Sequence, residues 1–178
     1  MKTTTHNKIK TRALEIIDKA GIVLTEKEKA GMEIAGLGLN DIERMGIEVI
    51  EYVNNDRYCA KEIILLPWQI CPEHRHPKVS EKNIGKQETF RCRWGIVYLY
   101  VDGDPASHPK AKVPGRYAKH LNVWNEVILH PGDQYTITPN GRHWFQGGPE
   151  GAVVSEFSSS STDENDIFTD PGVNRLKV

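Results

Sequence analysis

The sequence contains few cysteines, no excess of one charge sign and no long apolar run. Its three cysteines lack CxxC spacing, which argues against a disulfide framework and favours buried thiols. The net charge is −1 and both signs are interspersed, so the basic stripe that a nucleic acid or an anionic membrane would require is missing. No stretch is apolar enough to span a bilayer, and residues 1–10 lack the apolar core of a secretory signal. These absences predict a cytoplasmic protein that binds neither nucleic acid nor membrane.

The length of 178 residues favours a single domain with a sizeable core. The residue pattern changes near residue 47. It predicts a helical segment over residues 1–46 that packs on a β-rich barrel over residues 47–178. In residues 13–20 the apolar side chains fall on one helical face. Residues 25–28 (TEKE) fit a capping box that opens a second helix. Residues 40–43 are expected to cap a short third helix.

From residue 47 onward the sequence is typical of short strands. Segments rich in β-branched and aromatic residues are separated by turn signals such as residues 131–133 (PGD). Many short strands with frequent turns favour a sandwich or a barrel. Residues 104–119, rich in Pro, Lys and Ala, are expected to form a long excursion near the barrel mouth. The predicted strands span residues 47–53, 59–66, 94–101, 123–129, 134–138 and 152–157.

His74 and His76, with one residue between them, lie within residues 71–77 (CPEHRHP). This stretch directly follows an apolar run. Residues i and i+2 of a strand project to the same side, so both imidazoles are expected to enter one space. Glu88 leads into a predicted strand and supplies a carboxylate, and His143 supplies a third imidazole from a turn-rich stretch. Three imidazoles and one carboxylate are typical of a mononuclear divalent-metal site with open positions.

An isolated HxH pair is more often a surface or core feature than a metal site, and only the combination with Glu88 and His143 favours a metal. Glu73 and Glu81 are the alternative carboxylates. Glu73 is expected to face away from His74 if that segment is a strand, and Glu81 lies in a polar loop. The other histidines lack such a context and are interpreted as solvated or structural: His6, His108, His120 and His130.

These motifs resemble the two signatures of the cupin superfamily. The second signature is matched approximately by Gly132 and His143, with its Pro-x-Gly unit at residues 139–141 shifted one residue towards the histidine. In the first signature, eleven residues separate His76 from Glu88 in place of the usual short spacer. The spacing from Glu88 to the following glycine is intact, which predicts that the extra residues lengthen one loop.

A closer resemblance covers most of the chain. Six separated blocks are similar to the bacterial D-lyxose ketol-isomerase family, whose members are cupin sugar isomerases that use manganese. The resemblance implies interconversion of D-lyxose with D-xylulose and of D-mannose with D-fructose. It also implies that His74, His76, Glu88 and His143 are the metal ligands. The blocks are residues 55–62, 71–77, 85–93, 143–146, 151–157 and 166–171.

Such a reaction moves two hydrogens between C1 and C2 of an aldose. A divalent ion on three neutral imidazoles and one carboxylate would keep positions open for the sugar oxygens O1 and O2, and it would stabilise an enediolate. This ligand set suits manganese, iron or cobalt better than a closed thiolate zinc site. Manganese is the ion that the resemblance implies, with cobalt and iron as alternatives.

The reaction also requires an acid and a base near C1 and C2, and Glu156, Lys86 and Glu88 are the candidates. Glu156 lies in a mostly apolar strand, where a carboxylate is costly to bury unless it is paired or functional. We predict it as the base, with a structural salt bridge as the alternative. Lys86 would share a strand face with Glu88 and point towards the metal, and a solvated loop lysine is its alternative.

Aromatic faces suit the C–H face of a sugar, and forked donors suit its hydroxyl groups. Core packing is the alternative for Trp144, and a solvated strand end is the alternative for Lys61. Residues 158–166 form a polar run that could return over the barrel mouth or remain a solvated loop. Core packing is the favoured interpretation of Phe90. The predicted substrate-binding residues are Lys61, Arg91, Trp144, Gln146 and Asp166, with Tyr58, Phe90, Arg93, Asp163 and Asn165 as further candidates.

The sequence therefore predicts a single-domain, mainly β protein with a cupin double-stranded β-helix, or jelly-roll barrel, and a short N-terminal helical segment. It is expected to be a metal-dependent aldose–ketose isomerase and, by analogy with other barrels of this kind, a homodimer. An iron(II) cupin dioxygenase with the same ligands is one alternative, and it would consume oxygen. A non-catalytic sugar-binding cupin is the other, and its binding would survive loss of the acid–base residues.

Overall fold

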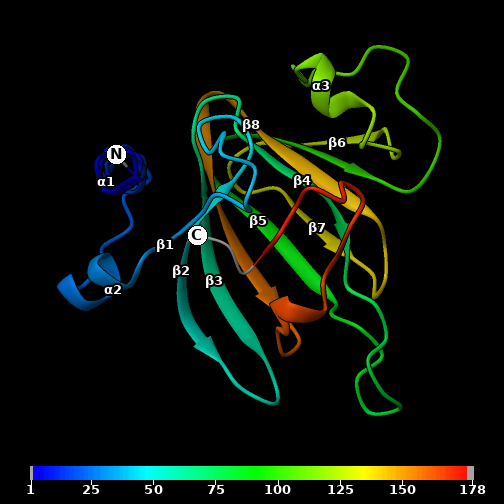
Figure 1. Ribbon diagram of the computed structural model, residues 1–178. Helices are drawn as coiled ribbons and strands as arrows, with labels where there is room; N and C mark the ends of the chain where they lie inside the picture. The colour runs from blue at the N-terminus through cyan, green and yellow to red at the C-terminus, as the bar shows by residue number, and fades with distance from the viewer. Residues whose placement is uncertain (1, 176–178) are drawn as a thin grey trace.

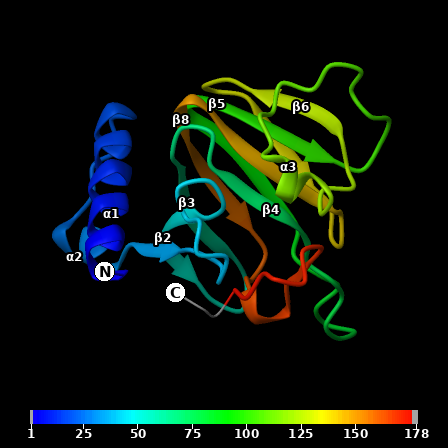
Figure 2. The same cartoon turned by 45° about the horizontal axis from the view of Figure 1, so that its top comes forward.

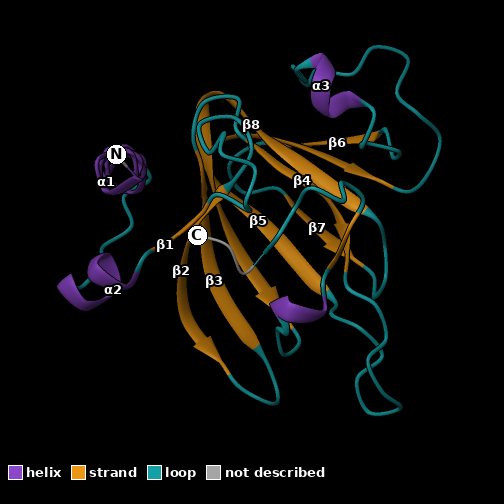
Figure 3. Ribbon diagram, in the orientation of Figure 1, coloured by secondary structure: helices purple, strands orange, loops and turns teal. Residues whose placement is uncertain are grey.

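A computed structural model describes residues 2–175. Nine strands form one strongly curled antiparallel sheet, and the helices lie at its periphery (Figures 1 and 3). The helices are α1 (Lys2–Lys19), α2 (Glu26–Gly31) and α3 (Gly115–Ala118), with a 3-10 turn at Asp163–Asn165. The strands are β1 (Glu33–Ala35), β2 (Ile47–Asn54), β3 (Cys59–Leu65), β4 (Ile70–Arg75), β5 (Glu88–Val101), β6 (Asn125–Leu129), β7 (Gln134–Ile137), β8 (His143–Ser158) and β9 (Ile167–Phe168).

The two longest strands, β5 and β8, pair with each other and connect two halves of the sheet. The first part of β8 pairs with β4, and its last part pairs with β3. On the outer edge of β5, β7 pairs with the first part and β6 with the last. One apolar cluster contains side chains from both halves, so the halves face each other across a common interior. The predicted barrel is confirmed.

Strands β5 and β8 both bend where Gly95 of β5 lies against Gly151 of β8. Gly95 and Gly151 have φ values of 73° and 94°, which are in the left-handed region that favours glycine. A Cβ atom on Gly95 would lie 2.1 Å from the carbonyl oxygen of Gly151, so no other residue fits without backbone movement. The β5–β8 register shifts at this point. The bend lets one strand serve both halves of the barrel.

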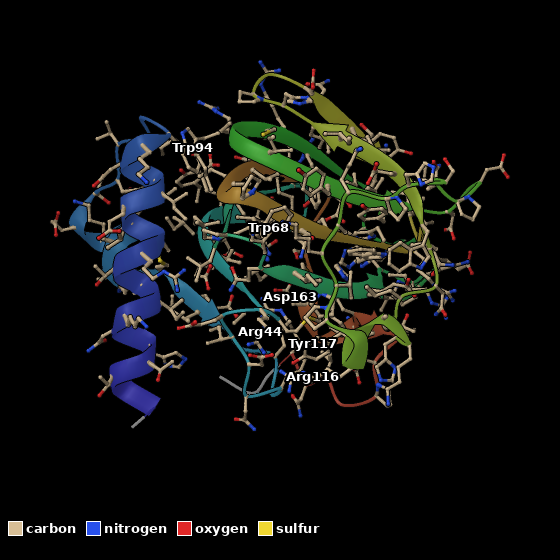
Figure 4. The ribbon with its side chains drawn as sticks, turned by 90° about the horizontal axis from the view of Figure 1, so that it is seen from above. Arg44, Trp68, Trp94, Arg116, Tyr117 and Asp163 are labelled. Carbon is tan, nitrogen blue, oxygen red and sulfur yellow. The ribbon has the colours of Figure 1, made fainter. Side chains whose placement is uncertain are left out.

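Helix α1 covers part of the outer face of the sheet, on the β2–β3 side (Figure 1). The apolar face expected over residues 13–20 is buried there. Trp94 lies beside this helix (Figure 4), with the Lys19 Nζ atom 5.8 Å from its ring centre. The side chains that form the contact are Ile9, Ala13, Ile16 and Ile17 on the helix, Ile50, Ile64 and Val153 on the strands, and Leu66 directly after β3.

The rest of the N-terminal segment was predicted only in part. Thr25 and Glu28 form the expected capping box of α2. The predicted third helix is wrong: the amides of Arg44 and Met45 both bond the Asp41 carbonyl in a single turn. Gly46 then donates its amide to the Ile70 carbonyl at 2.9 Å, which draws the chain towards β4 instead of continuing a helix.

Residues 104–119 do not lie at the barrel mouth, and that prediction is wrong. This segment carries α3 and covers the outer face of the sheet on the side away from α1 (Figure 2). The apolar side chains of Val113 and Tyr117 pack towards Trp144 on that face, and the barrel interior is already filled by another cluster. None of the helices in residues 2–175 combines the length and apolar character that crossing a bilayer requires.

Candidate metal centre

His74, His76, Glu88 and His143 meet inside the barrel. Their ligand atoms all lie within 4.8 Å of one another, and all four residues are buried. Pairing of β4 with β8 sets His74 directly opposite His143, and Glu88 is the first residue of β5. His76 follows the end of β4 and completes the group. The strand pairing thus brings together ligands that are up to 69 residues apart in the sequence.

Each of the three imidazoles is held by a hydrogen bond at Nδ1. The partners are carbonyl or carboxylate oxygens, which only accept, so Nδ1 carries a proton. The Nε2 atom of His76 also lies 3.2 Å from Glu88 Oε1. Burial lowers the pKa of His76, but Glu88 and Asp166 outweigh it and raise that pKa to about 9, so a metal ion would displace a second proton from this ring. All three rings therefore turn Nε2 towards a common point. The acceptors are the Pro72 carbonyl for His74 (2.8 Å), the Gly141 carbonyl for His143 (3.0 Å) and Asp166 Oδ1 for His76 (2.5 Å).

The atoms at this point fit a cation. His143 Nε2 is buried without a hydrogen-bond partner, although it lies 2.9 Å from Glu88 Oε1. Lone pairs and a carboxylate so close together repel one another unless a positive charge lies among them. Burial and the two neighbouring rings hold the pKa of His74 well below its usual value, which keeps that ligand neutral. The group could hold a divalent ion with nitrogen and oxygen ligands.

A buried chain of charges leads away from these ligands. Lys86 Nζ lies 2.6 Å from Glu88 Oε2 and 2.5 Å from Glu156 Oε1, and all three residues are less than one-tenth exposed. Burial alone would lower the pKa of Lys86, but the two carboxylates outweigh it and raise that pKa, so the ammonium stays charged. Lys61, the cross-strand neighbour of Glu156, lies 3.5 Å from Asp163 and extends the chain.

The pocket around these groups is narrow, with a cavity volume of ≈ 40 Å³. The segment 161–175, orange to red in Figure 1, contributes Asp163, Asp166, Phe168 and Arg175 to its lining. The polar run at 158–166 thus returns over the barrel, as one of its two interpretations predicted. The polar lining residues beyond the metal group are Lys61, Lys86, Glu156, Asp163, Asp166 and Arg175, and Phe90, Phe145 and Phe168 are among the apolar ones.

Residues 3–177 match the model of a family described as D-lyxose isomerase. The chain belongs to the D-lyxose isomerase family. It is 54% identical to the D-lyxose ketol-isomerase of Thermofilum sp. (strain ex4484_79), over 93% of this chain and 91% of that protein. It is 52% identical to the D-lyxose/D-mannose isomerase of Thermosediminibacter oceani, over 99% of this chain and 97% of that protein.

Solved structures with the same fold include L-ribose isomerases. That of Acinetobacter sp. DL28 superposes with a TM-score of 0.79 at 16% identity, covering 96% of this chain and 94% of that one. That of Cellulomonas parahominis gives a TM-score of 0.74, also at 16% identity, over 93% and 91% of the two chains. At this identity the likeness establishes the fold and not the substrate. It agrees with the predicted cupin-like barrel.

Three of the predicted sugar contacts of this isomerase do not line the pocket. Trp144 follows His143 on β8, and because side chains alternate along a strand it faces the opposite side. There its ring stacks on Tyr100 at 4.0 Å, so core packing is the correct interpretation. Gln146 points the same way and bonds the backbone of the excursion that covers this face. Its partners are the Lys112 amide and carbonyl and the Trp68 carbonyl.

Arg91 is exposed on the outer face of β5, where it lies 3.4 Å from Gln134. Its prediction as a sugar contact is therefore wrong as well. Arg93 and Tyr58 are also exposed and away from the pocket. The predicted contacts Lys61 and Asp166 do line the pocket, together with the further candidates Phe90 and Asp163.

The structure places the two alternative carboxylates elsewhere. Glu73 is buried but faces away from His74, and it accepts hydrogen bonds from the backbone amides of Asn122 and Val123. Glu81 has a side chain that is 92% exposed and pairs with Lys78 at 2.5 Å. Of the three carboxylates considered, only Glu88 reaches the histidines.

Proposed function

We propose that this isomerase interconverts D-lyxose with D-xylulose and D-mannose with D-fructose, with one divalent ion per subunit. The observation that carries the proposal is a buried cluster of three histidines and Glu88 beside the Lys86–Glu156 pair. Relatives at 52% to 54% identity named for these two sugars support the choice of substrates.

His74, His76, Glu88 and His143 would hold the ion. When bound, it supplies Lewis-acid polarisation of the two sugar oxygens at C1 and C2. Asp166 keeps the His76 ring oriented through its bond to Nδ1. Manganese is the proposed ion, with cobalt or iron as alternatives, because imidazole and carboxylate ligands suit these metals.

Glu156 is the proposed base. Its carboxylate is 3% exposed and lines the pocket that holds the ligand group, so it can take a proton from C2 and return it to C1. Lys86 lies between Glu156 and Glu88 and balances both charges. Its ammonium is the proposed acid: it would give a proton to O1 and take one from O2, so that the second hydrogen of the reaction also moves. The surrounding phenylalanines exclude water from the reacting carbons.

Anaerobic turnover by chelator-treated protein, reloaded separately with manganese, cobalt, iron and zinc, tests this function. We expect ketose from D-lyxose and D-mannose only after a metal is added, and at the same rate with or without oxygen. Oxygen uptake in step with sugar loss would instead identify a dioxygenase. Metal bound at one equivalent without any ketose would leave a sugar-binding protein, and either result would overturn the proposal.

We also propose that the protein is cytoplasmic and homodimeric. Its three cysteines are free and buried, which suits a reducing compartment. The outer sheet face beyond α1 exposes Phe157 by 51% and Tyr52 by 43%, and the exposed cation Arg93 lies near the buried carboxyl group of Glu62. Exposed aromatic side chains beside an arginine are the groups that interfaces between protein subunits preferentially bury.

Arg93→Glu should convert such a dimer into monomers, because it would bring two like-charged faces together. Sedimentation velocity at low micromolar concentration measures the change. Lys119→Glu, an exposed charge reversal elsewhere on the surface, is the matched control and should stay dimeric. A wild-type monomer, or an Arg93→Glu dimer of unchanged affinity, would contradict the proposed interface.

A further inference from the structure

The carboxy-terminal segment 161–175 supplies four residues of the pocket lining, Asp163, Asp166, Phe168 and Arg175. It contains the short strand β9 and otherwise lies outside the long strands of the barrel (Figure 1). The cavity volume is ≈ 40 Å³, so the lining residues lie close to one another. Polar groups of this segment are therefore among those that a sugar in the pocket would meet.

Strand pairing and polar contacts hold the segment on the barrel: β9 pairs with β4, Thr169 donates to Glu73, and the Ser161 amide donates to Asn54. Arg175 forms a forked ion pair with Glu33 of β1 and lies 2.8 Å from Asp163. The Asn174 amide bonds the Leu37 carbonyl at 2.9 Å. Arg175 was not among the predicted site residues, since nothing in its local sequence distinguishes it. Only the fold brings it to the pocket, 142 residues away from its partner Glu33.

Side-chain exposure orders these charges by depth. Glu88 is 1% exposed at the floor, and Lys61 is 6% exposed part-way up the wall. Arg175 and Asp163 are 13% and 31% exposed, and Glu33, which does not line the pocket, is 40% exposed. Arg175 and Asp163 therefore lie nearer the solvent than the candidate metal ligands do.

We infer that Arg175 and Asp163 bind the hydroxyl groups of the sugar carbons farthest from C1, an inference that rests on the proposed isomerase function. With C1 and C2 held at the floor beside Glu88, the remaining carbons of an open-chain sugar extend towards the mouth. There a guanidinium offers a rigid fork of donors and a carboxylate offers acceptors, which together match neighbouring hydroxyl groups.

The ionic surroundings keep both groups ready for a neutral ligand. Burial alone would raise the pKa of Asp163, but Lys61, Ser161 and Arg175 outweigh it and hold that pKa below its usual range, so the group remains an acceptor. Glu33 balances the charge of Arg175 from outside the pocket. When a sugar separates Arg175 from Asp163, each group keeps another partner of opposite charge, and neither is left as an unpaired buried ion.

The test pairs a variant with substrates that lack single hydroxyl groups. Turnover of D-lyxose, 4-deoxy-D-lyxose and 5-deoxy-D-lyxose is measured for the wild-type enzyme and for Arg175→Gln, each loaded with one metal ion per subunit. We expect Arg175→Gln to lower kcat/KM for D-lyxose by about 10- to 100-fold. For the analogue that lacks the bound hydroxyl, the loss should shrink to about threefold or less.

Glu33→Gln is the matched control, because it loosens the same ion pair from outside the pocket without removing a donor. Its loss should be equal for all three sugars. If Arg175→Gln also lowers kcat/KM by the same factor for all three sugars, Arg175 only holds the segment in place. That result would overturn the inference and leave the isomerase function intact. A wild-type enzyme that converts no aldose would instead remove the proposed function itself.

Discussion

Replacing Glu156 with glutamine is expected to lower kcat for D-lyxose by about 10²- to 10⁴-fold while one divalent ion per subunit stays bound. An amide has nearly the shape of a carboxylate but cannot accept the proton from C2. Glu156 is not part of the ligand group, and its contact to that group runs through Lys86 at 2.5 Å. Metal affinity should therefore change far less than turnover.

The measurement combines kcat, metal content by elemental analysis and exchange of the C2 proton with solvent deuterium. Glu48→Gln is a suitable control, since Glu48 is fully buried but lies outside the pocket, where it bonds Gln69 at 3.0 Å. The control should retain wild-type kcat. Parallel loss of metal and turnover in Glu156→Gln would assign Glu156 to the scaffold and leave the base unidentified.

The grouping of His74, His76, Glu88 and His143 could be predicted because their spacing is local in part. His74 and His76 are two residues apart, and Glu88 and His143 are each the first residue of a strand. The same alternation, applied to the residue after His143, would have placed Trp144 on the opposite face. An aromatic side chain next to a buried histidine therefore does not by itself indicate a sugar contact.

The mouth of the pocket could not be predicted in the same way. Lys61 reaches Ser161 across 100 residues of sequence, and Arg175 reaches Glu33 across 142. No periodic pattern connects such segments, because only the completed barrel brings them together. The short strand β1 was missed for a related reason: three residues are too few to show alternation, and pairing with β2 alone defines it.

His143→Ala is expected to lower metal affinity by more than about 100-fold and to abolish turnover. Loss of a group that only orients a ligand already costs about 10- to 100-fold in affinity, so loss of the ligand itself should cost more. His143 is fully buried, and its Nε2 has no other hydrogen-bond partner. Calorimetric titration with manganese measures this affinity independently of catalysis.

A graded comparison separates the metal centre from general damage to the barrel. Asp166→Asn leaves all four ligands in place and changes only the group at His76 Nδ1, so its affinity should lie between those of wild type and His143→Ala. Added metal should raise the melting temperature of the wild-type protein strongly, that of Asp166→Asn less, and that of His143→Ala hardly at all. Equal stabilisation of all three would mean that the ion binds elsewhere, because a ligand stabilises the folded state only as far as its site survives.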